Sequence, residues 1–115
     1  MAAPGTEAEA AGPAAVILPL EAGAIGPALA LATRLRDGGL AVGLEPAGRS
    51  LKALLRAADR RRARLAAILG EEELRAGRAT VRDLVRHQDR RQVLPLDASG
   101  PELARLLQAM IGGGE

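Results

Sequence analysis

The fold of this chain is decided by its middle segment, which reads Gly48-Arg49-Ser50-Leu51-Lys52-Ala53-Leu54-Leu55-Arg56-Ala57-Ala58-Asp59-Arg60-Arg61-Arg62-Ala63. Ser50 is a favoured N-cap residue, and the apolar residues after it recur at the i, i+3, i+4, i+7 spacing of one helix face. The residues on this predicted core face are Leu51, Leu54, Leu55 and Ala58. The residues on the opposite face are Lys52, Arg56, Arg60 and Arg61. The segment therefore predicts an amphipathic helix whose outer side is basic.

Positive charge is concentrated in this segment. The whole chain has 16 lysines and arginines against 14 acidic residues, a formal charge of +2, so bulk charge alone does not indicate a nucleic-acid partner. Between residues 49 and 64, however, Asp59 is the only acidic residue. Because aromatic content is 0%, any contact with RNA must use arginine planes, backbone groups and hydrogen bonds in place of base stacking on rings.

Length and composition limit the class of protein. A chain of 115 residues fits one domain, and its 0 cysteines exclude disulfides and thiolate chemistry. No apolar run approaches the roughly 20 residues of a membrane span, and the first residues do not follow the signal-peptide pattern. We expect a cytoplasmic protein without a membrane partner, comprising a disordered leader (residues 1–13), one folded domain (14–111) and a flexible tail (112–115).

The segments around the central helix predict two strand–helix units and a third strand. Residues 16–20 form a short apolar strand, and a helix follows that has Pro27 in its first turn and stops at Gly38-Gly39. Residues 40–44 alternate in a second strand before the central helix, and the near-continuous apolar run 65–69 is typical of a strand inside a sheet. Two such units in succession predict parallel strands.

The rest of the chain predicts a hairpin and a closing helix. A helical turn at residues 71–74 ends at Gly77. Residues 79–85 and 92–96 read as antiparallel strands joined by a polar loop, with Pro95 favouring an edge position. The spacing of Ser99-Gly100-Pro101-Glu102 is that of a capping box, and the helix after it has an apolar face of Leu103, Leu106, Leu107 and Met110.

Two groups of residues carry a resemblance to a known family. The first is Gly48-Arg49-Ser50-Leu51-Lys52-Ala53 continuing to Ala58-Asp59. The second is Ile68-Leu69-Gly70-Glu71-Glu72-Glu73-Leu74, followed by Thr80-Val81-Arg82-Asp83-Leu84 and Val93-Leu94-Pro95-Leu96-Asp97. Over about residues 16–97 the chain resembles the C-terminal anticodon-binding domain of class IIa aminoacyl-tRNA synthetases, most closely that of histidyl-tRNA synthetase. The resemblance implies a three-layer α/β fold with a mixed five-stranded sheet, in agreement with the predicted elements.

The chain departs from the family pattern in two respects. Leu54 and Leu55 stand where the family has glutamine and an aromatic residue, Ala57 where it has tyrosine, and Arg62 where it has a helix-ending glycine. The motifs of the family's catalytic domain, which binds ATP and histidine, do not occur, so we expect no aminoacylation by this chain alone and no cofactor. We expect a detached paralogue or a piece of a split or truncated histidine–tRNA ligase, and the leader that follows Met1 favours a free-standing product.

The resemblance implies a tRNA site built from two groups of side chains. Arg49, Lys52 and Arg56 would meet anticodon-stem phosphates, and the helix start at Ser50 could hold one phosphate through free amides. One of Glu71, Glu72 and Glu73, just past the third strand, would accept hydrogen bonds from a base edge. For both groups a solvated helix surface is the competing interpretation.

Other chemistry finds little support in the sequence. The segment Gly43 to Ser50 approaches a phosphate-loop pattern, but Arg49 stands at the lysine position and Gly70 where a magnesium-orienting aspartate is needed. His87 is the only histidine, which argues against a metal, and no nucleophilic triad is evident. We therefore expect a non-catalytic tRNA-binding module that works either alone or beside a separate synthetase catalytic chain. The alternative is a protein-interaction or regulatory module that kept the fold and lost RNA binding.

Overall fold

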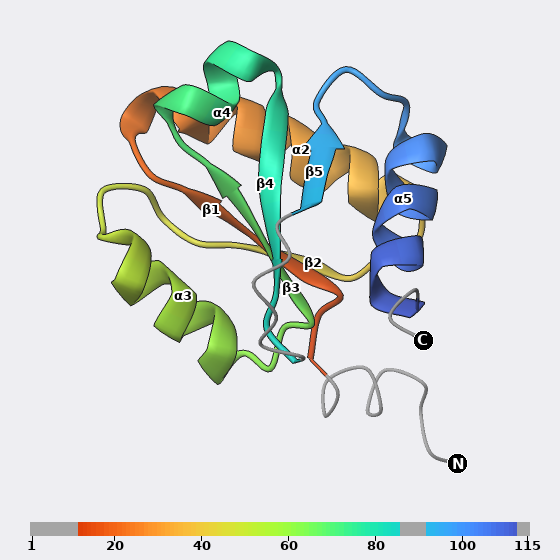
Figure 1. The fold of residues 1–115 in the computed structure, drawn as a ribbon, viewed down its shortest axis with the longest axis horizontal. Coiled ribbons are helices and arrows are strands. Elements are labelled where there is room, and N and C mark those ends of the chain that lie inside the picture. Colours follow the sequence, from red (N-terminus) through yellow and green to blue (C-terminus); the bar gives the residue numbers. More distant parts are fainter. Residues whose placement is uncertain (1–11, 86–91, 113–115) are drawn as a thin grey trace.

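The computed structural model describes residues 12–85 and 92–112, which form three layers (Figure 1). Helices α2 (Ile25–Asp37) and α5 (Gly100–Gly112) pack together on one face of a sheet, and α3 (Leu51–Arg60) lies on the other face. The short helices η1 (Ala22–Ala24) and α4 (Glu71–Ala76) follow the first and third strands. The arrangement confirms the predicted three-layer α/β class.

The sheet is mixed and has five strands in the order β2-β1-β3-β4-β5. The strands are β1 (Ala15–Pro19), β2 (Val42–Leu44), β3 (Leu65–Leu69), β4 (Arg78–Asp83) and β5 (Gln92–Pro95). β1 pairs in parallel with β2 and β3, whereas β4 is antiparallel to both β3 and β5. The two parallel units and the hairpin are therefore as predicted, and Pro95 does lie in an edge strand.

Strands β1 and β3 are buried along their whole length, which explains their continuous apolar sequences. Successive residues of β1 face opposite layers: Ile17 packs in the core beneath α2 and α5, and Val16 in the core beneath α3. In β3, Leu65 packs in the core beneath α2 and α5, and Ala66 packs in the core beneath α3. One sheet thus supports helices on both faces.

Helix α3 follows the predicted amphipathic pattern with one correction. Ser50 caps it, because its Oγ accepts a hydrogen bond from the amide of Ala53 at 3.1 Å. Leu54 and Ala58 are fully buried, but Leu51 is 36% exposed, so the prediction that Leu51 packs in the core is wrong. As the first residue of the helix, Leu51 lies beside the residues that follow β1 and β3.

The end of α3 has an unusual backbone conformation. Arg62, at φ 60°, is the one residue other than glycine with a positive φ in the described ranges. The amide of Ala63 reaches back to the carbonyl of Ala58 at 3.2 Å, the long-range bond of a Schellman-type ending. This turn normally takes glycine, so the substitution noted in the sequence leaves Arg62 in a conformation that L residues disfavour.

Some predicted boundaries shift by one or two residues. The fourth strand ends at Asp83, two residues earlier than predicted, because the Asp83 side chain accepts a hydrogen bond from the amide of Val85 at 3.0 Å and turns the chain.

None of the helices in the described part of the chain is long and apolar enough to cross a membrane. The predicted hairpin loop with His87, most of the leader and nearly all of the tail lie outside the described residues.

Candidate functional site

A depression of about 270 Å³ lies at the carboxyl ends of β1 and β3, between the starts of α3 and α4. Its lining combines apolar, acidic and basic side chains around Gly70, and consists of Leu20, Leu51, Ile68, Gly70, Glu71, Glu72, Glu73, Thr80 and Arg82. An apolar surface with a few convergent polar groups is a common form of ligand site.

The topology of the sheet explains why the depression is there. β1 lies between β2 and β3, and the helices that follow β1 and β2 cover opposite faces. Because β2 and β3 lie on opposite sides of β1, the order of the strands reverses between β1 and β3, and ligand crevices of open α/β sheets commonly lie beyond the carboxyl ends at such a switch point. Leu20 follows β1 and Gly70 follows β3, so both lie at this switch point.

The three glutamates of α4 have different surroundings. Glu73 is half-buried, and its Oε1 accepts a hydrogen bond from the amide of Gly70 at 2.8 Å. Glu71 is 74% exposed and forms a 3.4 Å ion pair with Arg75 on the helix surface. Glu72 is exposed and makes no side-chain hydrogen bond or ion pair with any residue in the described ranges. Of the three glutamates of α4, Glu72 is therefore the one whose carboxylate has no partner among the described residues.

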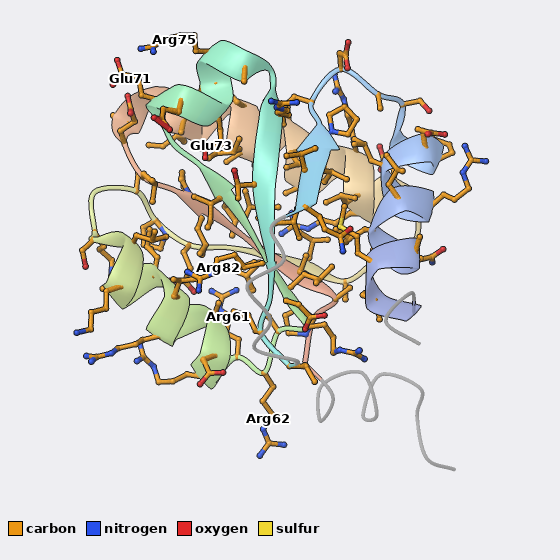
Figure 2. The ribbon with its side chains drawn as sticks, viewed as in Figure 1. Arg61, Arg62, Glu71, Glu73, Arg75 and Arg82 are labelled. Carbon is orange, nitrogen blue, oxygen red and sulfur yellow. The ribbon has the colours of Figure 1, made fainter. Side chains whose placement is uncertain are left out.

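The opposite wall of the depression comes from β4. Figure 2 shows Glu71 and Arg75 together at one end of the molecule, Glu73 between α4 and β4, and Arg82 nearer the middle of the sheet. Arg82 and Thr80 lie two residues apart on β4 and so share one face of the sheet. The depression thus combines hydrogen-bond acceptors on α4 with donors on β4, and Leu20, Leu51 and Ile68 supply its apolar surface.

The predicted phosphate-binding residues divide into two groups. Lys52 and Arg56 are exposed on the outer side of α3, together with Arg60 of the predicted basic face. The Ser50 hydroxyl is used by the cap of its own helix. Arg49 is 39% exposed and donates from Nη1 to Oε1 of Glu45 at 3.2 Å. Of the residues predicted to hold phosphate, Lys52 and Arg56 are exposed and make no side-chain hydrogen bond or ion pair with any residue in the described ranges.

Sequence reasoning missed Glu45, an acidic residue at the end of β2 that is only 6% exposed. Its Oε2 forms an ion pair with Nε of Arg61 at 2.8 Å, while its Oε1 accepts a hydrogen bond from Nη1 of Arg49 at 3.2 Å. One buried carboxylate therefore holds two arginines, one from each end of α3. The only local signal was an acidic residue directly after an apolar strand, which does not indicate its partners.

Metal chemistry has no candidate in the part of the chain that the structure describes. No group of three or more histidine, cysteine, aspartate or glutamate side chains there could hold a metal ion. His87, the residue weighed for this role in the sequence, lies outside the described ranges.

Sequence comparisons agree with this arrangement. Residues 14–105 match the anticodon binding domain family. The histidine–tRNA ligase of Sorangium cellulosum is 40% identical over 102 residues, which are 88% of this chain and 23% of that protein. The corresponding ligase of Halorhodospira halophila is 41% identical over 108 residues, 91% of this chain and 25% of that protein. The chain thus spans about a quarter of the length of these curated relatives.

Solved structures share the fold. A histidyl-tRNA synthetase from Nostoc superposes with a TM-score of 0.70 at 23% identity, covering 84% of this chain and 22% of that one. The RNA binding domain of threonyl-tRNA synthetase from Cryptosporidium parvum has a TM-score of 0.70 at 19% identity, covering 84% of this chain and 23% of that one. The resemblance seen in the sequence is confirmed, and the chain belongs to the anticodon binding domain family, with histidine–tRNA ligases among its relatives.

Proposed function

We propose that this chain is a tRNA-binding module that recognises the anticodon of a histidine tRNA and does not aminoacylate by itself. The observation that carries the proposal is the depression at the β1–β3 switch point, which has the unpaired carboxylate of Glu72 on one wall and Arg82 on the other. Family membership supports the same role. The chain would act in the cytoplasm, either free-standing or as a piece of a histidine–tRNA ligase, with a separate catalytic chain as its second partner.

Affinity and base discrimination come from two different kinds of contact. Lys52, Arg56 and Arg60 on α3 neutralise backbone phosphates, which gives affinity that falls with salt and carries no sequence information. Glu72 accepts hydrogen bonds from N–H groups on an unstacked base edge, which supplies discrimination. Because the chain has 0% aromatic residues, the base rests on the aliphatic surface of Leu20, Leu51 and Ile68 instead of on a ring.

Charge reversal on α3 tests this proposal. The double variant Lys52→Glu/Arg56→Glu is compared with Arg105→Glu, a charge reversal at an exposed position of α5 on the other face of the sheet. The α3 variant should lose most tRNA affinity at low salt, and its slope of log affinity against log salt should fall by about 0.7–0.9 per lost contact. Arg105→Glu should bind nearly as the wild type does. Equal behaviour of the two variants would contradict an RNA site on α3.

The second candidate is a protein-interaction module, and exposed apolar side chains on α2 favour it. Ile25 is 46% exposed and Leu29 is 51% exposed, and their i, i+4 spacing places them on one face of that helix. Under this candidate Ile25→Asp/Leu29→Asp abolishes capture of a synthetase catalytic chain, while Lys52→Glu/Arg56→Glu leaves capture unchanged. The two pairs of substitutions therefore separate RNA binding from protein binding.

A further inference from the structure

The ion-pair cluster of Arg49, Glu45 and Arg61 has the features of a prepared anion site. The carboxylate of Glu45 is 6% exposed, whereas Arg49 is 39% exposed and Arg61 is 42% exposed. The acidic member is thus hidden from solvent, and the two guanidinium groups form the accessible surface. The cluster keeps a net positive charge where it meets solvent.

The two arginines are held close together by a shared partner. One oxygen of the Glu45 carboxylate accepts a hydrogen bond from Arg49 at 3.2 Å, and the other forms an ion pair with Arg61 at 2.8 Å, so both guanidinium groups are held beside the same carboxylate. Without the carboxylate, the two positively charged guanidinium groups would repel each other. Each guanidinium has five N–H donors, and the contact with Glu45 uses a single nitrogen from each.

The path of Arg61 is also shaped by Gly43 on β2. A Cβ atom at Gly43 would lie 2.2 Å from Nη1 of Arg61, so the guanidinium packs directly on the glycine backbone. The absent side chain lets Arg61 cross β2 and reach Glu45. Because Gly43 is on β2, the cluster lies beside β2, whereas the depression lies at the carboxyl ends of β1 and β3.

We propose that Glu45 is a positioning residue that holds Arg49 and Arg61 as a preformed fork for one backbone phosphate of bound RNA. The inference rests on the proposed tRNA binding and adds a contact on the β2 side of the molecule. Its physical basis is preorganisation, because ordering two long arginine side chains before binding removes that cost from the binding step. A phosphate oxygen then meets the donors that Glu45 leaves unused.

The sign of one substitution distinguishes this role from simple charge. Glu45→Gln removes a negative charge next to two arginines, so general electrostatics predicts tighter RNA binding, whereas loss of positioning predicts weaker binding. Asp59→Asn is the matched control, because it removes the same charge from an exposed position of α3. Gly43→Ala adds a case without charge change, since the new methyl group displaces Arg61 from Glu45.

The experiment measures the affinity of the full chain for a histidine tRNA transcript, with each variant shown by circular dichroism to be folded at the binding temperature. We expect about tenfold weaker binding by both Glu45→Gln and Gly43→Ala, and equal or slightly tighter binding by Asp59→Asn. Unchanged or tighter binding by either of the first two variants would overturn the inference. Failure of the wild type to bind any tRNA would instead refute the proposed function, and it would be seen before the variants are compared.

Discussion

Glu73 and Thr80 are joined across the wall of the depression: Oε2 of Glu73 accepts a hydrogen bond from the Thr80 hydroxyl at 2.9 Å. Its other carboxylate oxygen accepts from the amide of Gly70 at 2.8 Å. A single side chain thus links the end of β3, the start of α4 and the middle of β4. Glu73 shapes the depression, and each of its carboxylate oxygens already accepts one hydrogen bond within the fold.

Removal of Glu73 should therefore lower stability. We expect Glu73→Ala to reduce the free energy of unfolding by about 1–3 kcal/mol, because two hydrogen bonds to a charged group are lost. Thr80→Val, which removes one of them, should cost less, and the double variant should cost less than the sum of the two. Urea unfolding followed by far-ultraviolet circular dichroism measures these values, since a chain with 0% aromatic residues has no tryptophan fluorescence. Strict additivity would contradict the link between Glu73 and Thr80.

Glu72 should behave in the opposite way. We expect Glu72→Gln to leave the free energy of unfolding within about 0.5 kcal/mol of the wild type, because Glu72 is exposed and unpaired with other described residues. The preference for an intact anticodon over a substituted one should fall by about fivefold or more, the effect of losing a base contact. Glu71→Gln is the control, since it removes the same charge from a surface ion pair. An equal loss of preference in both variants would mean that charge alone matters.

The left-handed backbone at Arg62 predicts a stabilising substitution. Arg62→Gly relieves the conformation at φ 60°, whereas Arg62→Ala removes the side chain and keeps the strained backbone. We expect the glycine variant to exceed the alanine variant by about 1 kcal/mol in the free energy of unfolding. Comparison of the two cancels whatever contacts the arginine side chain makes. Equal stability would show that the turn relaxes at no cost.

Leu54 stands where the family has a polar residue, and its burial makes it part of the core beneath α3. We expect Leu54→Ala to lower the free energy of unfolding by about 2–5 kcal/mol, because it opens a cavity among buried side chains. Leu51→Ala, at a position 36% exposed, should cost under about 1 kcal/mol. Thermal denaturation of the two variants tests the difference. Similar losses would place Leu51 in the core, as the helical spacing alone predicted.

Local patterns were sufficient to predict the order of the elements. The apolar runs of β1 and β3 and the Ser50 cap depend on residues close in sequence. The position of the acidic α4 start beyond a strand end was also predictable, because parallel strands place their carboxyl ends at one edge of the sheet.

The pairing of side chains within the site could not be read in this way. Arg49 was predicted to meet a phosphate, but the sequence did not indicate that it pairs with Glu45, which also pairs with Arg61 at the far end of α3. Periodicity assigned Leu51 to the core although the strands beneath it have already ended. Such relationships depend on where helix ends lie relative to the sheet, which is a property of the assembled fold.

The most direct measurement is the affinity of the purified chain for a histidine tRNA and for the same tRNA with a substituted anticodon, at physiological salt. We predict tighter binding to the intact anticodon by about tenfold, since base contacts in the depression add to phosphate contacts that the two RNAs share. Equal binding that disappears with salt, or no binding, would contradict anticodon recognition and direct attention to the exposed face of α2.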